Sequence, residues 1–266
     1  MGDLRLSGIT VYPVKAAGGI ACSSWEVDEF GLRYDRRWMV VDRLGEFLSQ
    51  RELPRLALLR TALLPDALCL RAPGLPELRV PLEPPEGPLL PVTVWAGTTE
   101  ARSVGPAAAD WLTRFLGVEC RLVYMPDSVV RPVDRRYARS GERTSFTDGF
   151  PFLLVSEASL ADLNRRLPAP LPMNRFRPNL VVDGCEPFAE DGWRRLQLGP
   201  LELSVVKPCA RCVVTTTDQE TAERGLEPLR TLATYRKRNG KVLFGQNAIH
   251  RGTGRLGVGM PIELLG

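Results

Sequence analysis

The stretch around which the chain is organised reads Val205-Val206-Lys207-Pro208-Cys209-Ala210-Arg211-Cys212-Val213-Val214-Thr215-Thr216-Thr217-Asp218. β-Branched residues fill both ends of this stretch, so the pattern predicts two strands joined by a short turn. The turn carries two cysteines together with a lysine and an arginine. A thiolate is both a nucleophile and a ligand for soft metals, and neighbouring cations favour the thiolate over the thiol. The stretch therefore predicts a reactive sulfur.

Four kinds of site fit two cysteines at this spacing. A zinc site needs two further ligands, but the chain has one histidine, His250, which is expected at the surface, and no second cysteine pair. A thioredoxin-like redox pair should open a helix, whereas the run after Cys212 favours a strand. Burial of both thiols in an apolar core is less favourable, because the charged residues Lys207 and Arg211 stand beside them. A thiolate ligand to a soft metal in a basic crevice fits these charges best, and the structural alternative stays open.

Composition narrows the class of protein. At 266 residues, with 44% hydrophobic and 25% charged residues, the chain is typical of a soluble protein of one large or two modest domains. A net charge of +4 and a pI near 8.8 suit a small anionic ligand better than nucleic acid. No apolar run is long enough to cross a membrane, and the N-terminus lacks a signal-peptide pattern, which predicts a cytoplasmic protein. Four cysteines stand alone and are expected to be small buried hydrophobes: Cys22, Cys69, Cys120 and Cys185.

Short apolar runs broken by proline and glycine predict an antiparallel barrel or sandwich. The expected strands cover residues 4–14, 25–27, 37–42, 56–64, 67–71, 78–82, 92–95, 100–104, 118–124, 151–155, 180–183, 195–198, 201–207, 213–217, 242–249, 254–258 and 262–265. Helices are expected at 107–116, 156–167 and 229–236, the second with Ser156 as its N-cap. Residues 125–149 form either a mobile connection or a loop that orders over a site.

Three basic residues are candidate anion ligands. Lys15 follows a strand on a glycine-containing turn, where a phosphate could reach it, although a solvated turn lysine fits equally well. Arg36 stands beside Asp35, and this sequence favours a surface ion pair over an inward phosphate ligand. Arg177, whose backbone is restricted by Pro178, is either an anion ligand or part of a surface loop. From the residues alone these alternatives remain open.

A set of motifs, in order along nearly the whole chain, resembles the MOSC-domain molybdenum proteins, specifically the amidoxime-reducing component family and its bacterial relatives. The motifs are Val11-Tyr12-Pro13-Val14-Lys15 with Gly18-Gly19, Asp35-Arg36-Arg37-Trp38, Pro151-Phe152-Leu153-Leu154-Val155-Ser156-Glu157, Asn164, Arg175-Phe176-Arg177-Pro178-Asn179, Cys209-Ala210-Arg211-Cys212 with Thr215-Thr216-Thr217-Asp218, Glu227-Pro228-Leu229, and Leu243-Phe244-Gly245-Gln246-Asn247. The motif with both cysteines is the most diagnostic of them.

The resemblance implies a fold and a site. The fold is mainly β with peripheral helices: an N-terminal β-rich barrel domain at residues 1–124, a connecting loop at 125–149 and a MOSC β-barrel at 150–266. A molybdenum-molybdopterin cofactor lies between the two domains, with the second cysteine of the motif, Cys212, as the protein's ligand to molybdenum and as the catalytic residue. Basic residues hold the pterin phosphate, and a loop adds pterin contacts. The cofactor-binding positions map to Lys15, Arg36, Thr147, Asp148, Arg177, Arg211 and Cys212.

The resemblance also implies a function. The chain is expected to reduce N-hydroxylated compounds such as amidoximes, hydroxylamines and N-hydroxylated bases. It carries no clustered cysteines of a ferredoxin-type domain, so electrons are expected from a separate ferredoxin- or cytochrome-type protein.

Lys207, Arg211 and Asp218 are candidates for tuning the metal, with a structural role equally open for each. The alternative is a carrier of the cofactor, or of a persulfide on Cys212, without turnover; no pyridoxal-phosphate domain accompanies it. Ala16 stands where relatives often carry serine, so backbone is expected to supply one phosphate hydrogen bond.

Overall fold

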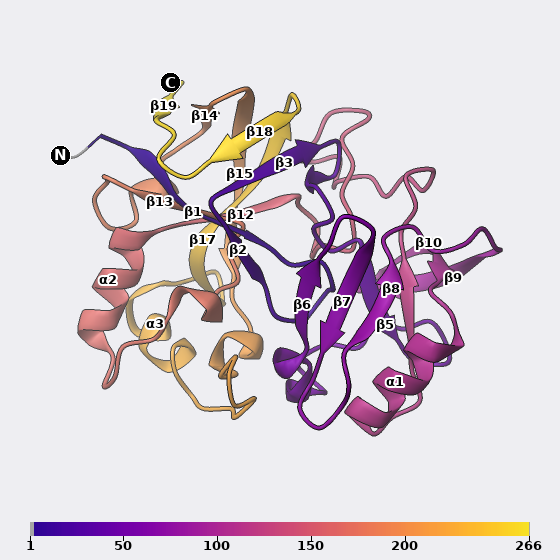
Figure 1. Ribbon diagram of the computed structural model, residues 1–266. Coiled ribbons are helices and arrows are strands. Elements are labelled where there is room, and N and C mark those ends of the chain that lie inside the picture. The colour runs from indigo at the N-terminus through magenta and orange to yellow at the C-terminus, as the bar shows by residue number, and fades with distance from the viewer. Residues whose placement is uncertain (1–2, 266) are drawn as a thin grey trace.

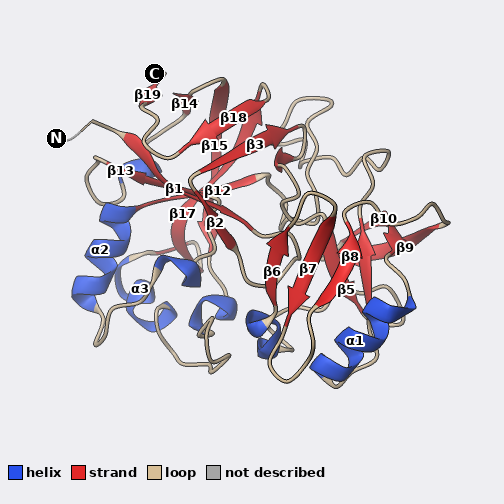
Figure 2. Cartoon of the chain, viewed as in Figure 1, coloured by secondary structure: helices blue, strands red, loops and turns tan. Residues whose placement is uncertain are grey.

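The computed structural model describes residues 3–265 (Figure 1). Within that range the chain forms 19 strands, three α-helices and four short 3₁₀ helices (Figure 2). The predicted fold, mainly β with peripheral helices, is confirmed. The terminal residues of the two predicted domains, 1–2 and 266, lie outside the described range.

A nine-stranded main sheet contains strands from both ends of the chain. Its spatial order is β19 (Ile262–Leu264), β14 (Arg195–Leu198), β15 (Leu201–Ala210), β17 (Lys241–Arg251), β12 (Phe152–Ser156), β13 (Leu180–Asp183), β1 (Arg5–Val11) and β2 (Ile20–Cys22), with β16 (Lys237–Arg238) paired to β17. Only the β12–β13 pair is parallel. Because β1 pairs with β13, the turn that follows β1 lies beside the C-terminal half of the chain.

Three smaller sheets complete the β-structure. One has the order β5 (Trp38–Val41), β11 (Arg121–Tyr124), β10 (Gly97–Ser103), β9 (Leu89–Val94). The others are β18 (Gly254–Gly257), β3 (Ser24–Asp28), β4 (Gly31–Leu32), and β6 (Arg60–Leu63), β7 (Ala67–Arg71), β8 (Leu78–Pro81). Figure 1 shows the last group beside α1 (Pro106–Leu116), away from the main sheet.

The helices lie at the edges of these sheets, and their ends follow ordinary capping chemistry. α1 begins with a proline and ends at Gly117, which adopts a left-handed conformation with φ 74°. α2 (Glu157–Arg166) is capped by Ser156, whose side chain accepts a hydrogen bond from Ser159 N, as predicted. α3 (Leu229–Tyr235) lies near α2 (Figure 1). None of the helices between residues 3 and 265 is long and apolar enough to span a bilayer.

The two largest hydrophobic cores belong to different sheets. Leu6, Phe152 and Leu203 lie in the core of the main sheet. Trp38 and Phe115 lie in the core between α1 and the smaller sheets. Since truncating one buried aromatic side chain costs about 3–5 kcal/mol, each core is able to hold its own group of strands rigid. The two groups can therefore present fixed walls to a space between them.

Two predicted strands are wrong. The run 213–217 forms the 3₁₀ helix η4 (Val213–Thr216) instead of a strand. The hydroxyls of Thr215 and Thr216 donate to the carbonyls of Cys212 and Val213 at 2.9 and 2.8 Å, which satisfies locally the groups that a strand would pair with a neighbour. Likewise, residues 56–58 of the expected strand 56–64 belong to the 3₁₀ helix η1 (Pro54–Leu58), which starts at a proline, and β6 is the part of that run that forms a strand.

His250 is buried, which corrects the expectation that it lies at the surface. Its side chain, 8% exposed, sits on the central strand β17, with Nε2 2.7 Å from the carbonyl oxygen of Asp28. The ring packs edge-on against Phe152 at 5.2 Å. Burial lowers the pKa of His250 below its ordinary value, although the Asp28 carbonyl partly opposes this. The folded protein therefore favours the neutral imidazole.

This shift predicts a pH dependence of stability. The unfolded chain binds a proton at His250 near the ordinary pKa of 6.5, whereas the folded chain binds it only at lower pH. Between these two pKa values the unfolded state thus binds more protons than the folded state. The free energy of unfolding should therefore fall as the pH falls from about 7.5 to about 5.5. Because the chain has one histidine, His250→Gln should flatten this slope in urea denaturation series. An unchanged slope would show that His250 is not the responsible group.

Candidate functional site

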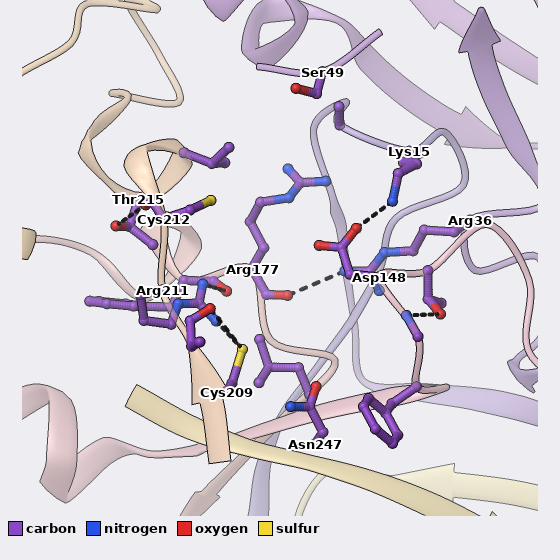
Figure 3. Close-up of a pocket in the computed structure, with 18 of the residues that line it drawn as sticks. Lys15, Arg36, Ser49, Asp148, Arg177, Cys209, Arg211, Cys212, Thr215 and Asn247 are labelled. Carbon is purple, nitrogen blue, oxygen red and sulfur yellow. Dashed lines mark hydrogen bonds and ion pairs between the residues drawn. The ribbon is translucent and has the colours of Figure 1, made fainter. Parts of the chain in front are cut away.

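A crevice lies between the main sheet and the smaller sheets, and its empty volume, including the part open to solvent, is about 930 Å³ (Figure 3). It is lined by segments from both halves of the chain. All seven residues predicted for the site line it: Lys15, Arg36, Thr147, Asp148, Arg177, Arg211 and Cys212. Cys209 lines it as well. The structure therefore brings together the predicted cations and both sulfurs of the cysteine motif.

Lys15 is held in the crevice by its backbone and by one ion pair. Its amide donates to the carbonyl of Trp38 at 2.8 Å, and its side chain is only 8% exposed. The ammonium lies 2.5 Å from Asp148 Oδ1 and 5.1 Å from the ring centre of Phe47. Burial lowers the pKa of Lys15, and the Asp148 carboxylate partly opposes this. The solvated-turn alternative for Lys15 is thereby excluded.

Asp148 comes from the loop that precedes β12, and two side chains hold its carboxylate. The same Oδ1 that meets Lys15 accepts a hydrogen bond from Trp95 Nε1 at 2.9 Å. Partial desolvation raises the pKa of Asp148, whose side chain is still 74% exposed, but the charge of Lys15 and these hydrogen bonds outweigh it and hold that pKa below its usual range. Residues 144–147 of this loop are buried. Of the two alternatives for residues 125–149, this part is the loop that orders at a site.

Arg36 and Arg177 share one aromatic ring. Their guanidinium carbons lie 4.2 and 4.3 Å from the ring centre of Tyr12. Arg36 pairs with Asp35 at 2.6 Å, but Asp35 is 1% exposed and Arg36 is 13% exposed, so the expectation of a surface ion pair was wrong. The pair is buried because Tyr12 N donates to Asp35 at 2.8 Å, which draws the carboxylate inward.

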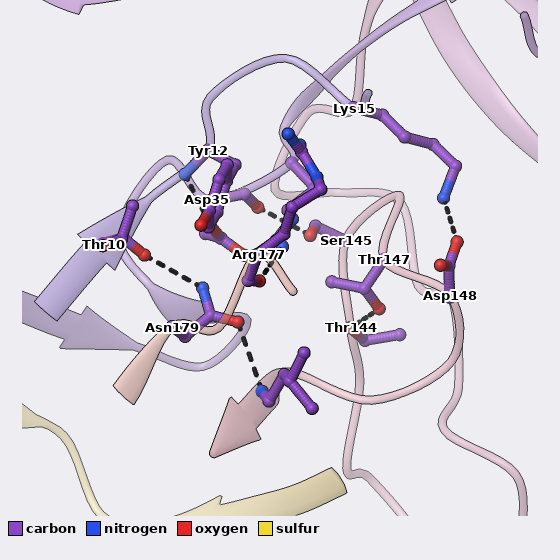
Figure 4. A network of polar contacts seen from close by, with 12 residues as sticks. Thr10, Tyr12, Lys15, Asp35, Thr144, Ser145, Thr147, Asp148, Arg177 and Asn179 are labelled. Atoms are coloured by element: carbon purple, nitrogen blue, oxygen red, sulfur yellow. Dashed lines mark hydrogen bonds and ion pairs between the residues drawn. The ribbon is translucent and has the colours of Figure 1, made fainter. Parts of the chain in front are cut away.

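Arg177 is a second deeply buried cation of the crevice; the whole residue is 9% exposed, against 6% for Lys15. Its Nη1 donates to the Ala17 carbonyl at 2.6 Å, while Nη2 is buried without a partner among residues 3–265. Burial, opposed by Tyr12 and assisted by the nearby charge of Arg36, lowers the pKa of Arg177 to about 10. Figure 4 shows the chain of polar contacts around it, with Asn179 donating to the Thr10 carbonyl. A buried donor without a partner leaves room for an anionic acceptor.

Three residues that line this part of the crevice have left-handed backbone. The φ angles of Ala16, Arg36 and Arg177 are 68°, 50° and 56°. Such a conformation costs roughly 1–3 kcal/mol at a residue other than glycine, and it persists where the surrounding contacts over-determine it. Arg177 also precedes Pro178, which further narrows its choices. The cations are therefore fixed in place by the fold.

The sulfur end of the crevice lies beside an irregularity in the pairing of β15 with β17. Between the pair of Pro208 with Gln246 and the pair of Ala210 with Leu243, β15 has one residue, Cys209, whereas β17 has two, so the additional residue of this bulge belongs to β17. A proline is tolerated beside such an irregularity because it has no amide hydrogen to pair. Cys209 lies in the strand and not in the predicted turn, and it lines the crevice. Cys212 follows two residues after the strand ends, at the start of η4.

Arg211 links the two cysteines to the neighbouring loop. Its Nη1 lies 3.0 Å from Cys209 Sγ, and its Nη2 donates to the Phe176 carbonyl at 2.6 Å. Its Nε is buried without a partner among the described residues. The thiols of Cys209 and Cys212 are both free and half-buried. Figure 3 shows the Cys212 sulfur directed into the crevice, on the side of Arg177.

Arg175 positions the cysteine motif without lining the crevice, and sequence reasoning missed it. Its guanidinium donates to the carbonyls of Thr215 and Thr216 at 3.0 and 2.9 Å and pairs with Asp218 at 3.2 Å. It thereby holds η4, which begins at Cys212. The Arg-Phe-Arg motif carried a signal, but only its second arginine was assigned a role.

Two of the three tuning candidates point elsewhere. Lys207 lies over the Tyr137 ring at 5.2 Å and is not among the residues that line the crevice. Asp218 pairs with Arg175 and also does not line it. Both have the structural role that was left open for them. Only Arg211 reaches the crevice.

The donor set of the crevice fits an anion at one end and a soft metal at the other. Buried N–H groups of Arg177 and Arg211 lack acceptors, and an oxyanion would supply them. A thiolate at Cys212 suits a soft metal. Among residues 3–265, however, no group of three or more His, Cys, Asp or Glu side chains could hold a metal ion. A metal at Cys212 would therefore need most of its ligands from a bound organic group.

Comparison with known proteins agrees with this geometry. The family model of the MOSC N-terminal beta barrel domain matches residues 3–119, and that of the MOSC domain matches residues 141–263. Mitochondrial amidoxime-reducing component 1 of Mus musculus is 38% identical over 96% of this chain and 81% of its own length. The Homo sapiens protein of the same name is 37% identical over the same shares. A molybdenum cofactor sulfurase of Oryza sativa subsp. japonica is 32% identical over 92% of this chain but only 32% of its own length.

Arg175→Ala should destabilise the protein by about 2–4 kcal/mol, because it removes charge-assisted hydrogen bonds and leaves the carbonyls of η4 buried without donors. Arg165→Ala is the matched control, since the exposed Arg165 pairs only with Asp162 on its own helix, and it should cost less than about 0.5 kcal/mol. Urea denaturation of both variants measures the difference. Equal small losses in the two variants would contradict the assigned role of Arg175.

Proposed function

Because the chain belongs to the MOSC family, with an N-terminal MOSC β-barrel domain ahead of a MOSC domain, we propose that it is a molybdenum-cofactor enzyme that reduces N-hydroxylated compounds. Its electrons would come from a separate ferredoxin- or cytochrome-type protein. The observation that carries the proposal is the crevice in which buried cations face a free thiol. Similarity to amidoxime-reducing components over nearly the whole chain supports the reductase activity.

The cationic end of the crevice would hold the phosphate of the cofactor. Lys15, Arg36 and Arg177 converge there, and a phosphate would give Arg177 Nη2 the acceptor that it lacks. Asp148 uses one of the three N–H donors of Lys15, so two remain for a phosphate. At Ala16, which has no hydroxyl, the backbone would supply the remaining contact. Thr147 and Asp148 would line the pterin.

The sulfur end would hold the metal and receive the substrate. Cys212 would be the protein's ligand, and Arg211 would fix the chain beside it through the Phe176 carbonyl. The molybdenum cofactor, when bound, supplies the two-electron chemistry of the reaction. An N-hydroxyl group takes up two electrons and two protons, its N–O bond breaks, and the products are an N–H group and water. The walls of the crevice would orient the substrate and limit the access of bulk water.

A carrier is the second candidate function. The similarity to a molybdenum cofactor sulfurase favours it, because that relative shares the same part of the chain. In this case Cys212 would carry a persulfide, or would hold the cofactor for delivery to another protein, without turnover. The half-buried, free thiol of Cys212 is compatible with either candidate. The two differ in whether electrons reach an N-hydroxylated compound.

Cys212→Ser should abolish reduction of an N-hydroxylated substrate, because a hydroxyl is a poor ligand for the soft metal. The fold and the pterin contacts should survive, so the thermal midpoint should change by less than about 3 °C. The measurement is turnover of benzamidoxime with a chemical or protein electron donor, together with molybdenum content. Cys22→Ser, at a half-buried cysteine outside the crevice, is the control. Full activity of the Cys212 variant would refute its assignment as ligand.

Replacing Lys15 and Arg177 together with Ala should lower the affinity for the cofactor by about 100-fold or more, because two charge-assisted phosphate contacts are lost. The readout is the molybdenum and pterin content of the purified protein. The matched control replaces the exposed Lys237 and Arg165 with Ala, which removes the same charges far from the crevice. Unchanged cofactor content in the first variant would show that these residues do not bind the phosphate.

A further inference from the structure

Asn247 lies in the crevice at a position that neither the phosphate nor the thiol chemistry uses. It belongs to β17, where it pairs with Lys207 of β15 and with Leu153 of β12. Its Nδ2 donates to the Lys207 carbonyl at 3.1 Å. This hydrogen bond assigns which end of the amide is nitrogen. Figure 3 shows the side chain at the sulfur end of the crevice, near Cys209, with the amide oxygen Oδ1 on the crevice side.

The oxygen of Asn247 is an unused acceptor. No hydrogen bond to Oδ1 comes from any group of residues 3–265. The other amide side chains of the crevice are engaged at both ends. Asn179 accepts from Leu153 N and donates to the Thr10 carbonyl, while Gln50 accepts from Gln219 and donates to the Ala16 carbonyl. Asn247 is thus the amide that can still accept a hydrogen bond from a bound molecule.

The chemistry of this acceptor limits what it can recognise. Figure 3 shows Cys209 and Arg211 at the same end of the crevice as Asn247. An amide oxygen can accept a hydrogen bond but cannot donate one, so it favours a ligand that carries an N–H or O–H donor. In an amidoxime or an N-hydroxyguanidine, the carbon that bears the N–OH group also bears an N–H donor. In a ketoxime, carbon takes the place of that nitrogen.

We propose that Asn247 is a positioning residue whose Oδ1 accepts a hydrogen bond from the N–H group beside the N–OH group of the substrate. This inference rests on the proposed reductase function and adds to it the residue that would favour N-hydroxylated amidines and guanidines over ketoximes. A ligand without the N–H donor leaves the crevice oxygen dehydrated and unpaired, which weakens its binding.

The test compares benzamidoxime with acetophenone oxime, which carries a methyl group in place of the amino group. Calorimetry on the oxidised, molybdenum-loaded protein without an electron donor measures binding free of turnover. The wild type should bind benzamidoxime about tenfold more tightly than acetophenone oxime. Asn247→Leu should lose this preference by weakening benzamidoxime alone, whereas Asn247→Asp, which keeps an acceptor oxygen, should retain it. Gln197→Leu removes an amide of the same sheet that lies outside the crevice and serves as control.

The outcomes separate this inference from the function on which it rests. A preference that disappears only in Asn247→Leu, at unchanged molybdenum content and thermal midpoint, supports the role of Asn247. Equal weakening of both oximes, or no change, overturns that role while benzamidoxime reduction by the wild type still stands. A wild type that neither binds nor reduces benzamidoxime overturns both. If Asn247→Leu fails to fold, Asn247→Ala, which also removes the acceptor oxygen, decides by the same criteria.

Discussion

Two guanidinium groups lie against one buried tyrosine ring, and the rest of the crevice depends on how the fold tolerates them. Arg36 and Arg177 both contact Tyr12, and the positive charge of Arg36 makes protonation of Arg177 less favourable. Asp35 neutralises one of the two. The remaining positive charge is buried, and a buried charge needs a partner or a ligand. The packing of this region therefore suits an anionic ligand.

The arrangement of the main sheet explains why this charge is not expelled to solvent. Strand β1 pairs with β13, so the turn with Lys15 and the loop with Arg177 meet although they are 162 positions apart in the sequence (177 − 15). The amide of Tyr12 holds Asp35, and the hydroxyl of Ser145 donates to the Asp35 carbonyl at 2.6 Å. These contacts outweigh the strain of the left-handed residues, as expected where a site is preorganised. Segments from three separate parts of the chain thus converge on one small volume.

Much of the fold could be predicted from the sequence, because short apolar runs between turn residues encode strands locally. β7, β13 and β14 lie where they were predicted. The helix η4 could not be predicted from local sequence. The guanidinium contacts that hold it come from Arg175, which is 40 positions away from Thr215. The site was readable in part. The residues alone marked Lys15, Arg177 and the cysteine motif, whereas Arg36, Thr147, Asp148 and Arg211 entered through family resemblance. Whether an ion pair such as that of Arg36 is buried is decided by tertiary packing, which no local pattern records.

The two ends of the crevice differ in how tightly the fold determines them, and this difference bears on what the family can do. At the cationic end, strained backbone and buried pairs leave little freedom, so the same arrangement of cations is expected in relatives that share these residues. At the sulfur end, Cys209 lies opposite a bulge of β17, Cys212 begins a single turn of 3₁₀ helix, and Asn247 keeps a free acceptor. Small changes there would alter what approaches the thiol without disturbing the anchor. An amidoxime-reducing component and a molybdenum cofactor sulfurase both contain this region, which covers only 32% of the sulfurase, and we expect the residues around Cys212 to vary among such relatives more than the cations do.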